Sequence, residues 1–327
     1  MLAEAVEAAY GIRVGALTFL PLGADSASAS YRVDDIDGAS YFVKVRACSG
    51  FSPASLLVPL HLQQQGVPHL LAPLPTRAEV PWVALDRFTV ALFPFVKGRI
   101  GAHAGLSERH WKELGATVGQ IHATQLPPEL VAILPHERFI PSRRPVVTRL
   151  QEVIAQQVAS DPLSVELAEF WNARRDQVRA LIRRADELAS RLRARSGSLV
   201  LCHADLHTWN ILLGSDEHLW LVDWDETILA RRERDLMFVV VGIGRDLVSP
   251  RQTACFLQGY GEVDIDPEAL TYYRYAWAVQ DLAAYGEQVL LLPGLGEATR
   301  RDALEGLKSL FEPGNIVEIA FGSDRSG

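Results

Sequence analysis

The chain has 327 residues, of which 48% are hydrophobic and 22% charged; this suits a globular protein with two lobes of unequal size better than one core. No apolar run reaches the roughly 18–20 residues that a membrane-spanning helix needs. The formal net charge of −8 argues against a broad nucleic-acid-binding surface and would suit a small cationic substrate.

The first hundred residues alternate short apolar runs with turn signals, as strands do. Strands are expected over 16–22 and, as a pair, over 82–98. Two apolar runs joined by "DDIDG" within 31–47 indicate a β-hairpin. A helix is expected over 52–66, although Pro59 argues against its middle part. The pattern predicts a small β-rich lobe with one helix.

From Ser107 onward the apolar residues follow the helical period. Ser107 is expected to cap a helix over 107–123, and 161–195 forms a long amphipathic stretch with its arginines on a solvated face. Helices resume between about 233 and 311. The change from strand to helix falls near 98–106. We therefore predict an N-terminal lobe over 1–98, with a hinge at 93–98, and a mainly helical C-terminal lobe over 99–327.

Two polar segments stand beside short predicted strands inside the larger lobe, namely "LCHADLHTWNILL" (201–213) and "VDWDE" (222–226). Because His203, Asp205 and His207 alternate, they would share one face of a strand and resemble half of a metal-hydrolase site. The remaining histidines have no ligand-like spacing to one another, which argues against that reading. A structural role, with His203 holding the loop and the acids forming turns, is a second alternative.

Phosphoryl transfer is the third alternative, and it accounts for the spacing of the whole cluster. The protein-kinase loop H-R-D-L-x-x-x-N places a proton-accepting Asp and a metal-binding Asn on one rigid turn. "HADLHTWN" (203–210) keeps His, Asp, Leu and Asn at those positions, with Ala204 in place of Arg. Asp223 stands where a second metal-binding aspartate is required. Hard oxygen donors suit Mg²⁺ beside the charged tail of ATP.

With these residues the chain resembles the aminoglycoside phosphotransferase family, which shares the protein-kinase-like fold. "HADLHTWNILL" and "LVDWDE" resemble the catalytic and metal loops of that family. The segments that resemble the spectinomycin phosphotransferase branch are 223–239, 256–266, 272–275, 281–287 and 311–321, with a fainter match at 29–45. The resemblance implies an α+β, protein-kinase-like two-lobed fold. It also implies ATP- and Mg²⁺-dependent phosphorylation of a hydroxyl on an aminoglycoside or aminocyclitol such as spectinomycin.

The resemblance assigns roles to the matching positions. Asp205 matches the catalytic base, and Asn210 and Asp223 match the Mg²⁺ ligands. Lys44, in "YFVKV", matches the strand lysine that pairs with the α- and β-phosphates. Residues 23–30 match the loop that positions the nucleotide, and Phe93 to Val96 match the interlobe hinge, whose backbone would bond the adenine edge. The predicted nucleotide-binding residues are Ser26, Ser28, Ser30, Lys44, Phe93, Phe95 and Val96.

The sequence departs from the kinase pattern at two places. The loop over the phosphates has one glycine, Gly23, so its contacts would come from serine hydroxyls and backbone N–H groups. No acid occurs between residues 47 and 66, where kinases carry the helix glutamate that holds the strand lysine. What orients Lys44 is therefore open at this point.

A cationic substrate would need acids near the transferred phosphate. Asp225 and Glu226 follow the predicted metal ligand, with exposed turn acids as the alternative. Trp277 and Asp281 share one face of a predicted helix by their spacing, where Asp281 would meet an ammonium. Core packing is the alternative for the aromatic residue.

We therefore expect an ATP-dependent small-molecule kinase with a small cationic aminocyclitol-type substrate and no nucleic-acid or membrane partner. The alternatives are a kinase of the same fold acting on a sugar, choline or homoserine, and a nucleotide-binding protein without catalysis. The three cysteines are scattered, and the first residues lack the basic and apolar regions of a signal peptide. A reducing, cytoplasmic location is therefore expected. The sequence does not indicate the oligomeric state.

Overall fold

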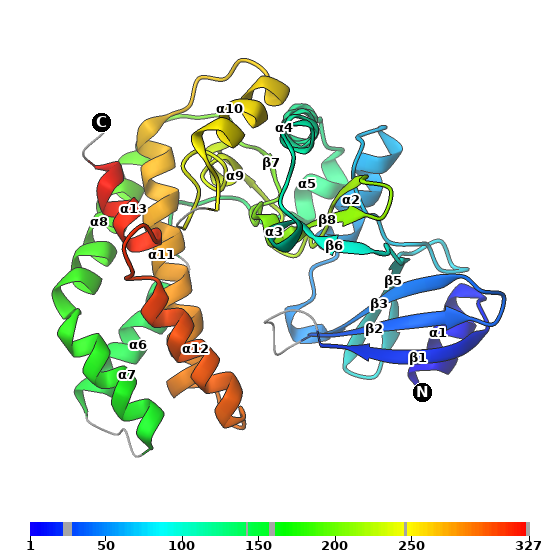
Figure 1. Ribbon diagram of the computed structural model, residues 1–327, viewed down its shortest axis with the longest axis horizontal. Helices are drawn as coiled ribbons and strands as arrows, with labels where there is room; N and C mark the ends of the chain where they lie inside the picture. Colours follow the sequence, from blue (N-terminus) through cyan, green and yellow to red (C-terminus); the bar gives the residue numbers. More distant parts are fainter. Residues whose placement is uncertain (22–27, 142, 157–160, 245–246, 325–327) are drawn as a thin grey trace. The chain divides into compact units, whose positions relative to one another are not determined.

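The structure is a computed structural model that describes residues 1–21, 28–141, 143–156, 161–244 and 247–324. It divides into two compact units (Figure 1). Unit 1 consists of Met1–Pro135, Leu201–Leu229 and Ala254–Glu262, and unit 2 of His136–Val200, Ala230–Thr253 and Val263–Gly327. No helix in the described ranges is long and apolar enough to cross a membrane.

An antiparallel five-stranded sheet in the order β1-β2-β3-β5-β4 begins unit 1. Its strands are β1 (Val14–Leu20), β2 (Ser28–Asp35), β3 (Ser40–Ala47), β4 (Val83–Leu85) and β5 (Phe88–Pro94). The β2–β3 turn closes with the backbone N–H of Asp35 donating to the carbonyl of Ala39, and Gly38 adopts the positive φ of 93° that this turn requires. The predicted hairpin and the predicted strands are confirmed.

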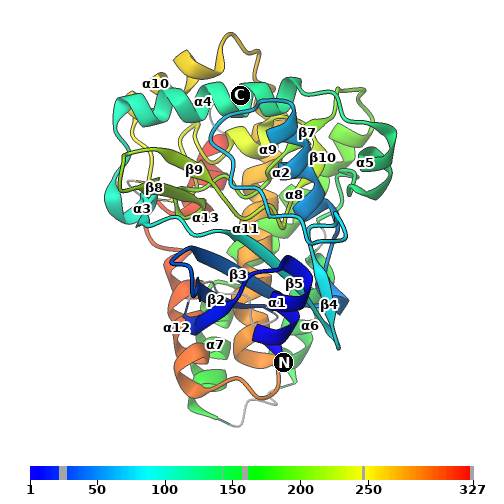
Figure 2. The ribbon, with the colours of Figure 1, turned by 90° about the vertical axis from the view of Figure 1, so that its right-hand side faces the viewer.

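One face of this sheet is buried under helix α1 (Leu2–Tyr10), which Figure 2 shows lying across the strands. Side chains alternate between the two faces of a strand, so Val43 points to the core while Lys44 points to the opposite face. Val6 of α1 is fully buried against Val33, Val43 and Val90. The prediction of a single helix in this part of the chain is wrong, because α1 is also present.

Helix α2 (Ala54–Gln64) follows the short turn η1 (Cys48–Gly50) and continues through Pro59. The proline removes the helical bond that its N–H would have donated to the carbonyl of Ser55. Burial of Leu56, Val58 and Leu62 on the helix offsets that loss, so tertiary packing keeps the helix intact where the sequence argued against it.

The rest of unit 1 carries the polar segments found in the sequence. A three-stranded sheet in the order β6-β8-β9 holds the loops on which they lie. The remaining strands and turns are β6 (Gly98–Ile100), β7 (Val200–Cys202), η2 (Thr208–Asn210), β8 (Ile211–Gly214), β9 (Leu219–Leu221) and β10 (Ile228–Ala230), which pairs with β7. The helices are α3 (Gly101–Ala104), α4 (Glu108–Ala123) and α5 (Pro128–Ile133). As predicted, Ser107 caps α4, accepting a bond from the N–H of His110 (3.2 Å).

Helix α10 (Pro250–Tyr260) crosses α4 at a point where only glycine fits. A Cβ built on Gly115 would overlap the carbonyl oxygen of Phe256, and one built on Gly259 would overlap that of Lys112. The backbones of the two helices therefore approach each other closely at these glycines. Next to the crossing, the hydroxyl of Tyr260 and Nδ1 of His122 are hydrogen-bonded (2.7 Å).

Gly259→Ala is expected to destabilise the protein by about 1–3 kcal/mol, because the added methyl group must displace a helix backbone. Differential scanning calorimetry should show a melting temperature lower by several degrees. The matched control is Gly322→Ala, since a Cβ at this exposed helical glycine meets nothing within 4 Å. The control should melt at or slightly above the parent temperature. Equal melting temperatures for Gly259→Ala and the parent would contradict the close crossing.

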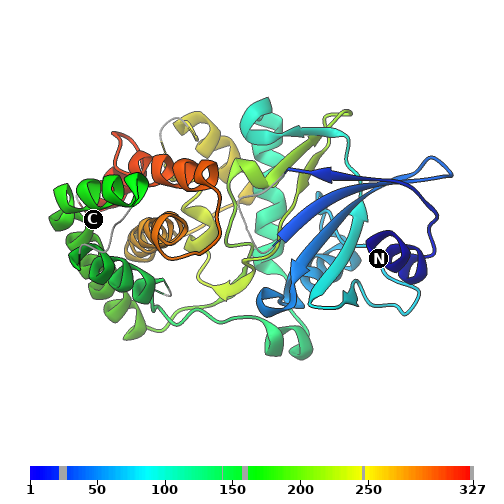
Figure 3. The same ribbon diagram turned by 90° about the horizontal axis from the view of Figure 1, so that it is seen from below.

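Unit 2 is helical and is organised around α11 (Pro267–Leu290), which contacts most of its other helices. Figure 3 views α11 nearly end-on, with the green helices α6 to α8 and the red-orange α12 around it. The helices that α11 contacts in unit 2 are α6 (Arg144–Ala155), α7 (Pro162–Ala173), α8 (Arg175–Arg193), α9 (Glu233–Leu236), α12 (Glu297–Ser309) and α13 (Ile316–Ser323). The long predicted stretch 161–195 is two helices, since the chain leaves helical geometry at Arg174.

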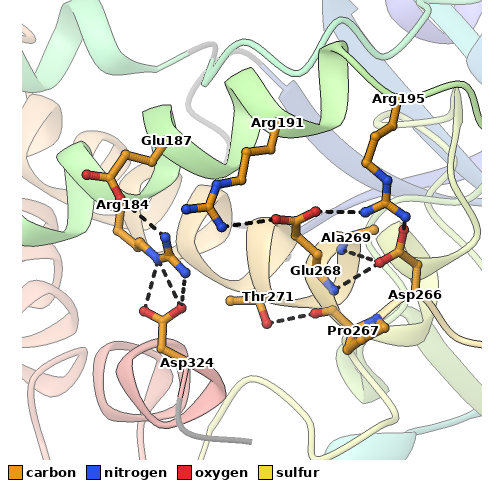
Figure 4. A network of polar contacts seen from close by, with 10 residues as sticks. All are labelled: Arg184, Glu187, Arg191, Arg195, Asp266, Pro267, Glu268, Ala269, Thr271 and Asp324. Carbon is orange, nitrogen blue, oxygen red and sulfur yellow. Dashed lines mark hydrogen bonds and ion pairs between the residues drawn. The ribbon is translucent and has the colours of Figure 1, made fainter. Parts of the chain in front are cut away.

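The arginines of α8 were expected on a solvated face, and in the structure several of them pair with acids of unit 2 (Figure 4). Arg184 makes a two-oxygen contact with Asp324 at the end of α13 (2.6 Å to Oδ1), and Tyr275 donates to the same carboxylate (2.7 Å). Arg195, two residues beyond the end of α8, donates to Glu268 (2.7 Å). Desolvation raises the pKa of Asp324, but the bonds from Arg184 and Tyr275 outweigh it and hold that pKa below its usual value.

Asp324→Asn should therefore lower the free energy of unfolding near neutral pH by about 1 kcal/mol, as expected for a partly exposed pair, and lower the melting temperature accordingly. Because the folded-state pKa is depressed, this stabilisation is present above the unfolded pKa near ~4 and is lost as the pH falls through the folded pKa. The gap between variant and parent in thermal melts should close towards pH ~3. Asp302→Asn, at an exposed position of α12, is the control. A gap that persists unchanged in acid would contradict the carboxylate's role.

Candidate active site

The loop after β7 is held by His203, whose side chain is completely buried. The backbone N–H of Asp205 donates to His203 Nδ1 (3.3 Å), so this nitrogen acts as an acceptor and the ring proton lies on Nε2. Nε2 then donates to the carbonyl of Val222 (3.0 Å), next to Asp223. His203 therefore ties the loop of Asp205 to the loop of Asp223. With both ring nitrogens engaged, it is poorly suited to the metal-hydrolase alternative.

Asp205 lies on this loop with its side chain 22% exposed and both carboxylate oxygens oriented. Asn210 donates through Nδ2 to Asp205 Oδ2 (2.7 Å), and His207 Nε2 lies 3.1 Å from Oδ1. Desolvation would raise the pKa of Asp205, but the hydrogen bond and charge of His207 outweigh it and hold that pKa below its usual value. Asp205 is thus an ionised acceptor at neutral pH, in a fixed orientation.

Two backbone positions beside these side chains adopt the left-handed conformation. Ala204 has a φ of 68° and Asp223 a φ of 63°. For alanine this geometry costs about 1–2 kcal/mol, whereas aspartate tolerates it better. Strained positions of this kind cluster at functional sites, where the surrounding bonds over-determine them. Here the backbone N–H of Val222 donates to the carbonyl of Asn210 (3.0 Å), which fixes the two loops side by side.

The donor set of these loops fits a divalent cation that prefers oxygen. Asn210 uses its Nδ2 for Asp205, which leaves its Oδ1 as the atom for a cation. The Asp223 side chain is 43% exposed, so its oxygens are accessible. Carboxylate and amide oxygens are the ligands that Mg²⁺ takes in nucleotide sites. Asn210 and Asp223 are therefore the residues that would hold it.

Lys44 on β3 meets both aspartates of the second loop. Its Nζ donates to Asp223 Oδ1 (2.9 Å) and to Asp225 Oδ2 (2.6 Å), with the lysine side chain only 18% exposed. Burial lowers the pKa of Lys44, but the two carboxylates outweigh it and raise that pKa above its usual value. Lys44 lowers the pKa of Asp223 to about 2 against desolvation. Lys44, for which the following helix offers no glutamate, is thus oriented by Asp223 and Asp225.

Of the other predicted nucleotide-binding residues, the described ones lie on the strands beside Lys44 or just after the end of the same sheet. Ser30 pairs with Lys44 across β2 and β3, and Ser28 pairs with Arg46, so both serines belong to a strand although the sequence placed them in a loop. Ser26 lies outside the described residues. Phe93 belongs to β5 and pairs with Phe42. The two remaining hinge residues are Phe95 and Val96, between β5 and β6.

The predicted substrate residues have different environments. Asp225 is engaged by Lys44 and by Arg46, while Glu226 is exposed. Trp277 is 6% exposed inside unit 2, where its ring packs edge-on against Phe238 at 4.9 Å between centroids, as the packing alternative requires. Asp281 lies on the same helix and is partly buried. A substrate role for these four residues stays a prediction.

Arg46 is a site residue that the sequence reading missed. It forms an ion pair with Asp225 Oδ2, and its side chain is 19% exposed. The signal was present in "VKVR", because residues two apart on a strand share a face, and Arg46 follows Lys44 by two.

Three features together define a kinase-like phosphotransferase. They are the paired Lys44 on the sheet, the loop on which Asn210 orients Asp205, and the exposed Asp223. The chain belongs to the phosphotransferase enzyme family, whose model matches residues 18–278. Protein StrN from Streptomyces griseus is 27% identical over 282 residues, which cover 82% of this chain and 78% of StrN.

Solved structures agree with this assignment. Spectinomycin phosphotransferase APH(9)-Ia, in complex with ADP and spectinomycin, superimposes with a TM-score of 0.88 at 30% identity, covering 99% of this chain and 98% of that one. The amicoumacin kinase hAmiN, with AMP-PNP and Ca²⁺, has a TM-score of 0.65 at 17% identity over 98% of this chain and 96% of that one, and shows the shared fold. The α+β, protein-kinase-like fold, the resemblance to aminoglycoside phosphotransferases and the phosphotransferase class with an alcohol acceptor are confirmed. The lobe boundary at residue 98 stays a prediction.

Proposed function

We propose that this protein transfers the γ-phosphoryl group of ATP to a hydroxyl of a spectinomycin-like aminocyclitol or aminoglycoside, with Mg²⁺ as the metal. The observation that carries the proposal is the convergence of Lys44 with Asp223, at 2.9 Å, beside the loop that orients Asp205. A cytoplasmic location, where ATP is available, belongs to the same proposal.

Each residue has a separate task in this reaction. Asp205 orients the acceptor hydroxyl through its free lone pairs and takes its proton. Because the pKa of Asp205 is held low, the carboxylate is a weak base, which suits a loose transition state in which the proton leaves late. Lys44 binds phosphate oxygens. Asn210 and Asp223 would hold the Mg²⁺ ion, which when bound would neutralise negative charge on the phosphates.

The substrate class rests on chemistry and on relatives. The protein carries a net charge of −8, and Glu226 adds an exposed acid three residues after Asp223 in the same loop, so a cationic ring system is favoured over an anionic one. The APH(9)-Ia structure at 30% identity contains spectinomycin. Asp225, Trp277 and Asp281 complete the proposed set of substrate residues. No nucleic-acid partner is proposed.

The test is incubation with ATP and Mg²⁺ and a panel of spectinomycin, other aminoglycosides, sugars, choline and homoserine, followed by mass spectrometry. One added phosphate on spectinomycin or a related aminocyclitol is the expected result. Phosphate on a sugar, choline or homoserine alone would replace the substrate class and keep the reaction. Nucleotide binding without any phosphorylated product would favour the alternative of a binding protein. Asp205→Asn, run in parallel, controls for contaminating kinases.

A further inference from the structure

We propose that Arg46 is a second cation for the phosphates of the nucleotide, and that Asp225 positions Arg46 and Lys44 together in place of the missing helix carboxylate. This inference rests on the proposed nucleotide-dependent function and adds two roles to the site. Asp225 is thereby a positioning residue first, whatever it contributes to the substrate.

The register of the sheet places both cations on one face. Lys44 and Arg46 are two residues apart on β3, so their side chains leave the strand on the same side. Their partners across β2 are Ser30 and Ser28, which lie on that same side. Tyr41, Val43 and Val45 leave β3 on the opposite face. Val43 there belongs to the buried core under α1. The cationic face is therefore the one away from the core.

One carboxylate oxygen serves both cations. Asp225 Oδ2 lies 2.6 Å from Lys44 Nζ and also forms the ion pair with Arg46 Nη1. The side chains of Arg46 and Asp225 are each 19% exposed, so water screens these contacts only partly. A carboxylate shared in this way sets the spacing of the two positive groups, which is the task that a helix glutamate performs for a single lysine in kinases.

The helix that follows β3 cannot supply that carboxylate. Helix α2, ASLLVPLHLQQ, contains no acid, and the chain has none between residues 45 and 78. The two acids that reach the strand cations come instead from the metal loop, at positions 223 and 225.

The charges of this group explain why a second cation is useful. Lys44 and Arg46 balance Asp223 and Asp225 as long as all four pair with one another. Once Asp223 is committed to a metal ion, Lys44 and Arg46 share one carboxylate and present a net positive charge to a phosphate tail. A guanidinium has five N–H donors in a planar fork, so it can bind Asp225 through Nη1 and still address phosphate oxygens.

Isothermal titration calorimetry with Mg·ADP and, separately, adenosine tests the role of Arg46 without an acceptor substrate. Arg46→Gln is expected to weaken Mg·ADP binding by about 10- to 100-fold and to leave adenosine binding unchanged, because only ADP has phosphates. Arg46→Lys should recover part of the loss. Arg13→Gln, which removes an exposed arginine paired with Asp37, is the matched control and should bind as the parent does.

The role of Asp225 is tested by repeating Arg46→Gln in an Asp225→Asn background. If Asp225 positions Arg46, the loss of Mg·ADP affinity should be clearly smaller there than in the parent background. Equal losses in the two backgrounds would overturn the positioning role, and parent-like Mg·ADP binding by Arg46→Gln would overturn the phosphate role. Both results leave the proposed function intact if the parent binds Mg·ADP. A parent that does not bind Mg·ADP would overturn the inference and the proposed function together.

Discussion

Asp205→Asn should lower kcat by about 10²–10⁴ while nucleotide affinity stays near the parent value. The amide keeps the size of the side chain but loses the acceptor strength and one acceptor atom. It also places an N–H group where the hydroxyl of the substrate must donate. A coupled assay that detects ADP in the presence of the acceptor measures kcat, and calorimetry with Mg·ADP measures the affinity.

Asp216→Asn is the control for this substitution, because Asp216 lies on the turn between β8 and β9, where it caps the backbone N–H of His218 (3.1 Å). It should retain parent activity. Near-normal turnover by Asp205→Asn would remove the assigned mechanism. Loss of nucleotide binding by this variant would show instead that the loop had lost its structure, since Asp205 also receives the bond from Asn210.

The contact between Asp205 and Asn210 could be predicted from the sequence because it is local. Asp205 and Asn210 are five residues apart on one turn, so their spacing alone specifies that they meet, and the structure joins them at 2.7 Å. His203 was expected to support the loop, but its partner, the carbonyl of Val222, lies 19 positions further along the chain and could not be inferred from the neighbours of His203.

The partner of Lys44 could not be predicted, because it depends on a long-range contact. Kinases carry this carboxylate on the helix after the strand, whereas the acids that contact Lys44 lie 179 and 181 positions away along the chain. Helix α1 was missed for a different reason. Leu2, Val6 and Tyr10 show helical spacing and Gly11 ends the helix with a φ of 75°, so the signal for this helix is local and present in the sequence.

Asp223→Ala should abolish the gain in ATP affinity that Mg²⁺ provides. We expect this gain to be at least about tenfold, which is roughly the effect of losing one hydrogen bond to a charged group. Asp223 supplies the exposed carboxylate of the donor set, and Asn210 alone is a weak, neutral ligand. Catalysis should fall by a further factor of about 10²–10³ or more, because charge on the transferred group is no longer stabilised.

The measurement is titration of ATP with and without Mg²⁺, using EDTA to remove the metal. The parent should bind ATP more tightly with Mg²⁺ than with EDTA, whereas Asp223→Ala should bind equally in both. Lys44 should keep its 2.6 Å contact with Asp225 in this variant, so binding of the phosphates without metal should survive. Residual ATP binding in EDTA would therefore show that the variant has lost the metal and not the fold. Asp216→Asn again serves as the control and should respond to Mg²⁺ as the parent does. If Asp223→Ala retained the full Mg²⁺ response, another residue would have to hold the metal, and the convergence of Lys44, Asn210 and Asp223 would no longer account for phosphoryl transfer.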